Sequence, residues 1–393
     1  MAERIYFDWN ATAPLRPPAR AAAAAALGVC GNPSSVHAEG RAVRRGIEQA
    51  RESVAALVGA EPRNVVFTSG GTEANMMALS PFLETGPGLE PRDCLLVSAI
   101  EHPSVLAGGR FPRNAIELVP VAADGRLDLA ALERQLAALA RNGRQRPLVS
   151  IMLANNETGV VQPVAQAAAL AQAAGALVHV DAVQGAGRIH CNINEMGADL
   201  LTLSGHKIGG PKGAGAVVKR RQALHFTDPL IKGGGQERGA RAGTENVACI
   251  VGFGAAAADV RPVLATESAR MAELRDRLEA GLKARMPAAV VFGAQAPRLP
   301  NTTLFAVPGI KAETAVIALD LDGIAVSSGA ACSSGKVQPS HVLAAMGVAP
   351  PLAQGAIRVS LGPTTTESEI DRFLDAWIRL SKALLKGAHG IAA

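Results

Sequence analysis

Short apolar runs alternate with alanine- and leucine-rich segments along residues 40–260. The runs hold four to six residues, several of them β-branched, which is typical of buried strands. They are Val65–Thr68, Leu95–Ser98, Leu148–Leu153, Leu177–Asp181 and Leu200–Leu203. Between them, segments such as Leu127–Ala140 and Val164–Ala174 carry apolar residues at helical spacing. The alternation predicts an α/β domain with a mostly parallel sheet and helices on both of its faces.

The pattern changes after about residue 260. Thr266–Met286 has the spacing of a long helix, Ser327–Gly335 is a loop of small residues, and a final helix is expected near Ser368–Leu385. We therefore expect a smaller α+β domain over residues 261–393, after a large domain over residues 16–260. Residues 1–15 are expected to form an N-terminal arm that packs with the small domain.

Composition fits a globular protein with an aliphatic core. The chain is 48% hydrophobic, 19% charged and 3% aromatic, which is too apolar for intrinsic disorder. The net charge of +5 comes without a long Lys/Arg run, so no nucleic-acid-binding arm is expected. No apolar stretch reaches the length of about 18 residues that predicts a membrane-spanning helix.

The five cysteines are scattered and show no C-x-x-C spacing. An odd, dispersed set indicates free thiols in a reducing compartment rather than a disulfide framework. The alanine run Ala21–Ala26 lacks the basic leader of a signal peptide. A cytoplasmic location is therefore expected.

Two predicted strands end in residues with complementary chemistry. Asp181 closes one apolar run, and Lys207 follows the next in the segment Ser204-Gly205-His206-Lys207. Neighbouring parallel strands deliver such residues to the same rim of a sheet. Pyridoxal phosphate needs a lysine for its Schiff base and an acid at its ring nitrogen. An Asp and a Lys at strand ends are common, however, so this pair alone does not decide the function.

Glycine and polar residues follow three further strands. The segment Thr68–Asn75 joins a strand to a helix and can bind an anion through backbone amides and the Thr72 hydroxyl, or can be a simple helix cap. His102 can stack on a planar ring and move protons, although a lone histidine is more often structural. The turn Asn155–Gly159 and Gln184 supply amide donors, while asparagine-rich turns usually satisfy their own backbone.

Cys332 differs from the other four cysteines in its setting. It lies in the loop of small residues Ser327–Gly335, which suits an exposed nucleophile that moves between partners. The others have apolar or strand-like surroundings and are expected to be inert core thiols: Cys30, Cys94, Cys191 and Cys249. Arg358 lies within a strand-like run, where it can bind a substrate carboxylate or form a structural salt bridge.

Taken together, the motifs resemble the pyridoxal-phosphate-dependent cysteine desulfurases of the NifS/IscS type, first group, which have PLP transferase fold type I. The matching runs span nearly the whole chain. They are Asp8–Thr12, Gly31–His37, Thr68–Asn75, Glu101–Pro103, Asn155–Gly159, Asp181–Gln184, Ser204–Lys207, Gly210–Gly213, Gly233–Asn246, Ser327–Gly335 and Ile357–Gly362. Ala330 departs from the serine that the family often has there. The resemblance implies a mostly parallel sheet of seven strands.

The resemblance also implies roles for single residues. Lys207 would form the Schiff base and move the α-proton, Asp181 would keep the ring nitrogen protonated, and His102 would stack on the ring and assist proton transfer. Gln184 and Asn156 would contact the ring oxygen and the bound amino acid, and Arg358 with Asn156 would bind the substrate carboxylate. The phosphate would be held by Gly71, Thr72, Ser204, His206 and, from the second subunit of a homodimer, Thr244. No metal site is implied.

The implied reaction removes sulfur from L-cysteine, which gives L-alanine and a persulfide on Cys332 for an acceptor such as an iron–sulfur scaffold protein. Two alternatives stay open. A C–S lyase or aminotransferase of the same fold would keep Lys207 and Asp181 without needing Cys332, and a scaffold with this fold would not be catalytic. The sequence does not distinguish iron–sulfur assembly, nitrogen fixation and tRNA thiolation as the sulfur's destination.

Overall fold

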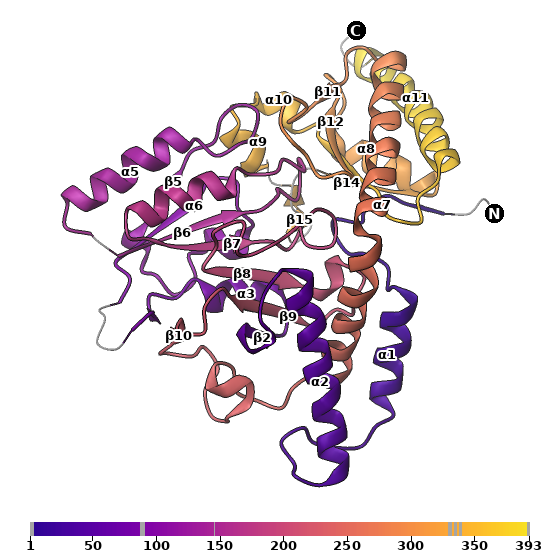
Figure 1. Cartoon of the computed structure of the whole chain (residues 1–393). Helices are drawn as coiled ribbons and strands as arrows, with labels where there is room; N and C mark the ends of the chain where they lie inside the picture. The colour runs from indigo at the N-terminus through magenta and orange to yellow at the C-terminus, as the bar shows by residue number, and fades with distance from the viewer. Residues whose placement is uncertain are drawn as a thin grey trace.

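The computed structural model describes residues 4–86, 91–144, 146–328, 332–333, 336–337 and 340–390. A seven-stranded sheet forms the centre of the larger part (Figure 1). Its strands, in spatial order, are β2 (Val65–Thr68), β9 (Gly215–Lys219), β8 (Leu200–Ser204), β7 (Leu177–Asp181), β6 (Pro147–Met152), β4 (Cys94–Ser98) and β5 (Ile116–Val119). Neighbours are parallel except at β9, which is antiparallel to both β2 and β8. The carboxyl ends of the six strands other than β9 therefore lie at one edge.

Helices cover both faces of this sheet. They are α1 (Pro17–Leu27), α2 (Ala38–Leu57), α3 (Gly71–Ala78), α4 (Pro103–Leu106), α5 (Leu129–Arg141), α6 (Val164–Ala173) and the first half of α7 (Val247–Arg285). Strand residues such as Val178 and Leu201 pack against α2, α6 and α7 in one core cluster. Their neighbours Leu177 and Leu200 point to the opposite face, where α3 and α4 pack. The period of two along each strand thus places a core on both sides.

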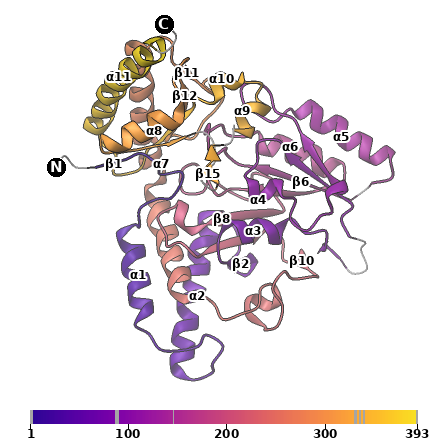
Figure 2. The same ribbon diagram turned by 180° about the vertical axis from the view of Figure 1, so that it is seen from behind.

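A smaller antiparallel sheet lies beside the larger one and is packed by α7, α8 (Ala312–Leu321) and α11 (Glu367–Gly390) (Figure 2). Its strands are β11 (Val290–Val291), β12 (Thr302–Ala306), β17 (Ile357–Ser360) and β14 (Ser327–Ser328). The N-terminal strand β1 (Ile5–Tyr6) pairs with β13 (Ile324–Ala325), so the start of the chain packs with this part. The remaining elements are β3 (Leu83–Glu84), β10 (His225–Phe226), β15 (Cys332–Ser333), β16 (Lys336–Val337), α9 (His341–Ala345) and α10 (Pro350–Ala353).

The longest helix, α7, begins 19 residues before the expected start of that helix at Thr266 and runs through the expected domain boundary near residue 260. Glycines and Pro262 made its first half look non-helical in the sequence. The structure shows a packing reason for one glycine, because a Cβ on Gly254 would lie 2.4 Å from the Cα of Ala50 in α2. One stretch of α7 is long and apolar enough to span a membrane by length and composition alone. Its residues Ile250, Phe253 and Val260 are buried in the core of the large sheet.

Candidate functional site

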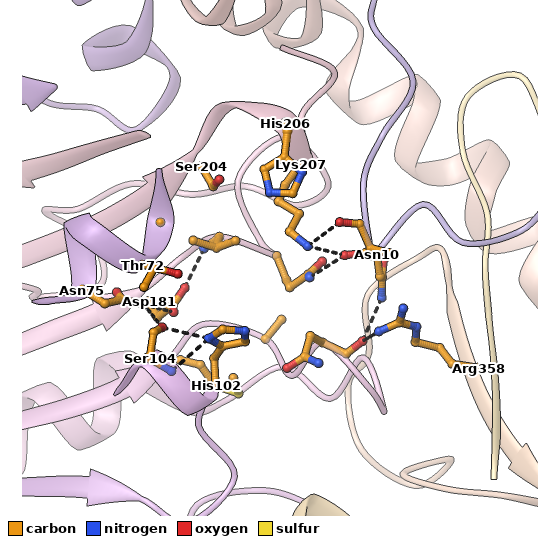
Figure 3. A pocket seen from close by; sticks show the side chains of 17 residues that line it. Asn10, Thr72, Asn75, His102, Ser104, Asp181, Ser204, His206, Lys207 and Arg358 are labelled. Carbon is orange, nitrogen blue, oxygen red and sulfur yellow. Dashed lines mark hydrogen bonds between the residues drawn. The ribbon is translucent and has the colours of Figure 1, made fainter. Parts of the chain in front are cut away.

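A cavity of about 210 Å³ opens at the carboxyl edge of the large sheet (Figure 3). Ten of the residues expected at the site line it: Gly71, Thr72, His102, Asn156, Asp181, Gln184, Ser204, His206, Lys207 and Arg358. They come from loops and helices that follow β2, β4, β6, β7 and β8, and from β17 of the small sheet. The topology therefore gathers residues that lie far apart in the sequence.

Lys207 lies in a 3₁₀ turn directly after β8. Its Nζ donates to the backbone carbonyls of Asn10 at 2.6 Å and Ala11 at 2.8 Å. Burial, followed by the positive charges of Arg188 and Arg358, lowers the pKa of Lys207 to about 7. A large fraction of its amines is therefore uncharged near neutral pH, which is the form that attacks a carbonyl carbon or accepts a proton.

Asp181 is the last residue of β7 and is buried. Its Oδ1 accepts the backbone N–H of Val183 at 2.9 Å, and its Oδ2 accepts from Asn75 Nδ2 at 2.8 Å. Donors on both oxygens favour the ionised carboxylate and leave each oxygen with further lone pairs. The group can therefore accept a hydrogen bond from a protonated ring nitrogen.

A site that can bind an anion lies where α3 begins. Gly71 opens this helix, and Thr72, Ser204 and His206 line the same cavity. A Cβ on Gly71 would lie 3.1 Å from Val183 Cγ2 and 3.3 Å from Ser204 Cβ, so the close approach of these segments favours glycine. Backbone amides and hydroxyls at a helix N-terminus bind phosphate groups well. Burial, followed by the charge of Lys207, lowers the pKa of His206 to about 4, so its ring is neutral here.

His102 precedes α4 and lies across the pocket from Lys207 in the view of Figure 3. Its Nδ1 accepts the backbone N–H of Ser104 at 3.2 Å and lies 2.8 Å from the Ser104 hydroxyl. Since a backbone N–H can only donate, Nδ1 carries no proton and the neutral ring is protonated at Nε2. Desolvation in the pocket wall lowers the pKa of His102, although Asp181 opposes this effect.

Arg358 is buried in β17, where the sequence left open a structural salt bridge or the binding of a substrate carboxylate. Its Nη2 donates to Asp8 Oδ1 at 2.7 Å, and its Nη1 donates to the backbone carbonyl of Asn156 at 2.9 Å. Within the described residues its buried Nε has no hydrogen-bond partner. The guanidinium therefore forms a structural ion pair, and Arg358 also lines the cavity.

Of the two remaining expected site residues, Thr244 does not line this cavity, and the side chain of Cys332 cannot be placed relative to it. The backbone of Cys332 lies in β15, which Figures 1 and 2 show between the large sheet and the small one, and its side chain lies outside the described part of the structure. Thr244 is exposed on the loop before α7, beside a separate hollow. That loop contains Glu237 and Arg238 with positive φ angles, and the carboxylate of Glu237 is held by Arg51 in a buried ion pair of 2.7 Å.

Several residues that line the cavity were not predicted from the sequence, among them Asn10, Asn75 and Ser104. Asn10 and Asn75 stand inside the matching runs Asp8–Thr12 and Thr68–Asn75, so their position was a signal that could have found them. Asn10 binds the Lys207 amine through its backbone carbonyl, which no residue-type pattern reveals. Asn75 needs the neighbouring strand to be placed next to Asp181.

Residues 5–373 match the family described as aminotransferase class-V. The chain belongs to this family. A cysteine desulfurase of Cereibacter sphaeroides is 46% identical over 95% of this chain and 94% of its own length. The cysteine desulfurase IscS of Dictyoglomus turgidum is 38% identical over 98% of this chain and 96% of its own length.

Solved structures agree with this assignment. A NifS-like protein from Rickettsia africae superposes with a TM-score of 0.87 at 36% identity, over 97% of this chain and 100% of that one. A structure described as SspA in complex with cysteine gives a TM-score of 0.74 at 29% identity, over 92% of this chain and 100% of that one. The expected PLP transferase fold of type I is therefore confirmed, and enzymes of this class use pyridoxal phosphate.

Proposed function

We propose that this class-V protein is a cysteine desulfurase that binds pyridoxal phosphate and removes sulfur from L-cysteine. One observation carries the proposal: a single cavity holds a buried lysine amine with a lowered pKa, a carboxylate with donors on both oxygens and an anion site. Among the described residues, these three groups are Lys207, Asp181 and the α3 N-terminus with Thr72. The names of the relatives support the same reaction.

The donor set fits the cofactor part by part. The phosphate matches Gly71, Thr72, Ser204 and His206, while the ring nitrogen matches Asp181. Lys207 supplies the amine that carries the cofactor, and Gln184 is within the same cavity to donate to the ring oxygen. When bound, the cofactor withdraws electrons from the α-carbon of an attached amino acid.

The chain's own residues then perform the remaining tasks. Arg358 and the Asn156 amide bind the substrate carboxylate, which fixes the amino acid in one orientation. Lys207, uncharged in a large fraction of molecules, takes the proton from the α-carbon. His102 faces the same cavity with its ring proton on Nε2 and assists proton transfer there.

Sulfur leaves by attack of a thiolate on a thiol sulfur. The Cys332 thiolate forms an S–S bond with the substrate sulfur as the substrate's Cβ–S bond breaks, and the electron pair of that bond stays on Cβ, which takes up a proton. Cβ is reduced by two electrons, the Cys332 sulfur and the substrate sulfur are oxidised by one electron each, and the products are L-alanine and a Cys332 persulfide. No further oxidant or reductant is needed.

The surroundings of this reaction belong to the same proposal. The persulfide passes its terminal sulfur to a thiol of an acceptor protein, such as an iron–sulfur scaffold, in a reducing cytoplasm. The active form is a homodimer in which Thr244 of each protomer contacts the phosphate bound by the other. Exposure of Thr244 away from its own protomer's cavity supports this arrangement.

The decisive experiment incubates the cofactor-loaded protein with L-cysteine and measures alanine and sulfide in the presence of a reductant. We expect both products in equal amounts. Cys332→Ala should lower their formation about 100-fold or more, because it removes a nucleophile that acts only in the chemical step. Cys30 was expected in the core but is exposed on the loop between α1 and α2, so Cys30→Ala should keep the activity. Undiminished turnover of Cys332→Ala would instead indicate a C–S lyase, and absence of any turnover by the unmodified protein would indicate a scaffold.

A further inference from the structure

A row of polar side chains runs through the large sheet to Asp181 and has no part in the proposed chemistry. Ser150, His179 and Thr202 lie on adjacent strands β6, β7 and β8 and are fully buried. In the sheet register Ser150 is opposite His179, and Thr202 is opposite Asp181. Their neighbours on the same face, such as Leu148, Leu177 and Leu200, are apolar and pack against α3 and α4. Three polar residues in one apolar layer require a specific explanation.

Asn75 of α3 connects this row to the cavity. Its Nδ2 donates to Asp181 Oδ2 at 2.8 Å and to Ser104 Oγ at 2.9 Å, which uses both of its protons (Figure 3). Its Oδ1 accepts from Thr202 Oγ1 at 2.6 Å. The opposite amide orientation would place an oxygen against the carboxylate oxygen, so an ionised Asp181 permits only this one.

The orientation of Asn75 fixes the direction of every bond behind it. Because the Thr202 hydroxyl proton goes to Asn75, Thr202 Oγ1 accepts from His179 Nε2 at 3.2 Å. Burial lowers the pKa of His179 to about 3, so the ring is neutral and holds a single proton, at Nε2. His179 Nδ1 therefore accepts from Ser150 Oγ at 2.8 Å. Ser150, His179, Thr202 and Asn75 thus form one chain in which each member donates toward Asp181.

We propose that Asn75, Thr202 and His179 are positioning residues, a polarised hydrogen-bond chain that holds Asp181 ionised and aimed at the cavity. This rests on the proposed function, in which Asp181 faces the cofactor's ring nitrogen. Hydrogen bonds that point the same way strengthen one another in a buried setting, so the charge of Asp181 and the proton position on His179 depend on each other. His179 never contacts Asp181 through its side chain, yet it reports the charge there.

The test is nuclear magnetic resonance of the holoenzyme with ¹⁵N-labelled histidine. The protein has eight histidines, and the His179 signals are assigned by their loss in His179→Gln. We expect a protonated Nε2 and an unprotonated Nδ1. In Asp181→Asn, an isosteric change that removes the charge, Asn75 can reverse its amide and Thr202 can turn its hydroxyl to His179. The ring proton of His179 should then shift toward Nδ1.

Two further variants make the result specific. Thr202→Val removes the acceptor of the Nε2 proton and should move that proton to Nδ1, which keeps the test available if Asp181→Asn is unstable. Glu101→Gln is the matched control, because Glu101 is another fully buried carboxyl group near Asp181 outside the chain. It should leave the His179 signals in place. A wild-type His179 protonated at Nδ1, or unchanged signals in both Asp181→Asn and Thr202→Val, would overturn the proposal.

The same spectra of cofactor-free protein separate this inference from the proposed function. The chain consists only of protein groups, so the Nε2 proton and its shift in Asp181→Asn are expected with or without cofactor. Alanine formation from L-cysteine is measured on the same samples. A protein with the expected His179 signals but no turnover would refute the desulfurase proposal alone, whereas a desulfurase with an Nδ1 proton on His179 would refute the chain alone.

Discussion

At the scale of single residues, the surroundings of the Lys207 amine act on its charge in two opposite directions. Its amine donates to two backbone carbonyls, while burial and two arginines disfavour its charge. After burial, Arg188 lowers the pKa of Lys207 the most. Arg188 is itself fixed by hydrogen bonds to the backbone carbonyl and side chain of Gln184. A buried cation thus keeps a neighbouring amine reactive.

This predicts a pH profile for the attachment of pyridoxal phosphate to the apoprotein. Only the uncharged amine reacts, so the rate of labelling at Lys207, trapped with borohydride and located by peptide mapping, should rise up to a midpoint near pH 7 and level off above it. Arg188→Met removes a like charge and should move the midpoint to higher pH. Arg41→Met, at an exposed arginine of α2, should not move it. A wild-type midpoint near the ordinary lysine value of 10.5 would contradict this account.

Ten of the expected site residues could be placed in one cavity from sequence because they follow strand ends or stand in short motifs. Asn75 stands in a matching run, but its bond to Asp181 could not be predicted, because that contact depends on how α3 lies against the end of β7. The direction of a hydrogen bond is a property of a whole network, and no local pattern encodes it.

At the scale of elements, the segment that carries Cys332 is attached to the pocket at its far end. Ser340 caps α9 by accepting the N–H of Leu343 at 3.1 Å, and its hydroxyl donates to the buried Glu157 at 2.6 Å. His341, next in the chain, lies with Nε2 2.9 Å from the backbone carbonyl of Glu101. Glu157 and Glu101 are neighbours in sequence of Asn156 and His102, so α9 is tied to the walls of the cavity.

Ser340→Ala should therefore impair sulfur removal more than substrate binding. It removes a helix cap, at a cost of about 1 kcal/mol, and the bond that ties α9 to the Asn156 turn. We expect a lower kcat for alanine formation with a smaller change in KM. Asp128→Ala removes the comparable cap of α5, far from the cavity, and should lower stability without this kinetic effect. Equal kinetics in the two variants would contradict the positioning of Cys332 through α9.

Burial raises the pKa of Glu157 to about 7, although its bond to Ser340 opposes this. An unfolded chain releases this proton near pH 4.5, so the folded state loses stability as the pH rises from there to about 7. The loss amounts to roughly 3 kcal/mol at most. Glu157→Gln cannot ionise, and its free energy of unfolding relative to wild type should increase over this pH interval. Chemical denaturation at pH 5 and pH 8 measures it, and a constant difference would contradict the shift.

The five strands expected from apolar runs are present within one residue at each end, because each is buried on both faces. The other two strands of the large sheet, β5 and β9, were not predicted individually. β5 is an edge strand with partly exposed residues, and β9 follows the glycine-rich segment after Lys207. The first half of α7 was missed because its glycines serve close helix packing, which depends on α2.

At the scale of the whole molecule, the proposed dimer predicts complementation between two impaired variants. A mixed dimer of Lys207→Ala and Thr244→Ala protomers would hold one site with both changes and one site with neither. We therefore expect a differentially tagged and purified mixed dimer to regain about half of the wild-type activity. If Thr244 acted within its own protomer, neither site of the mixed dimer would be intact, and activity would not exceed about half of what the Thr244→Ala dimer retains.

The sequence pattern predicts how segments pack within one chain better than it predicts contacts between two copies of the chain. Pairing of β1 with β13 joins the start of the chain to the smaller part, and the expectation of an N-terminal arm rested on the change of pattern along the chain. The role of Thr244, by contrast, needs a second copy of the chain, and only the resemblance to a family supplied it. The hollow beside Thr244 and the buried pair of Arg51 with Glu237 are consistent with a loop shaped for such a contact.

The most direct measurement of the central claim is mass spectrometry of the cofactor-loaded protein after a brief exposure to L-cysteine without reductant. The account predicts that the peptide containing Cys332 gains the mass of one sulfur atom, that the gain disappears on adding a thiol reductant, and that one alanine forms for each modified protomer. The peptides containing the other four cysteines should be unchanged. Alanine formed over many turnovers with an unmodified Cys332, or sulfur bound to another cysteine instead, would contradict it.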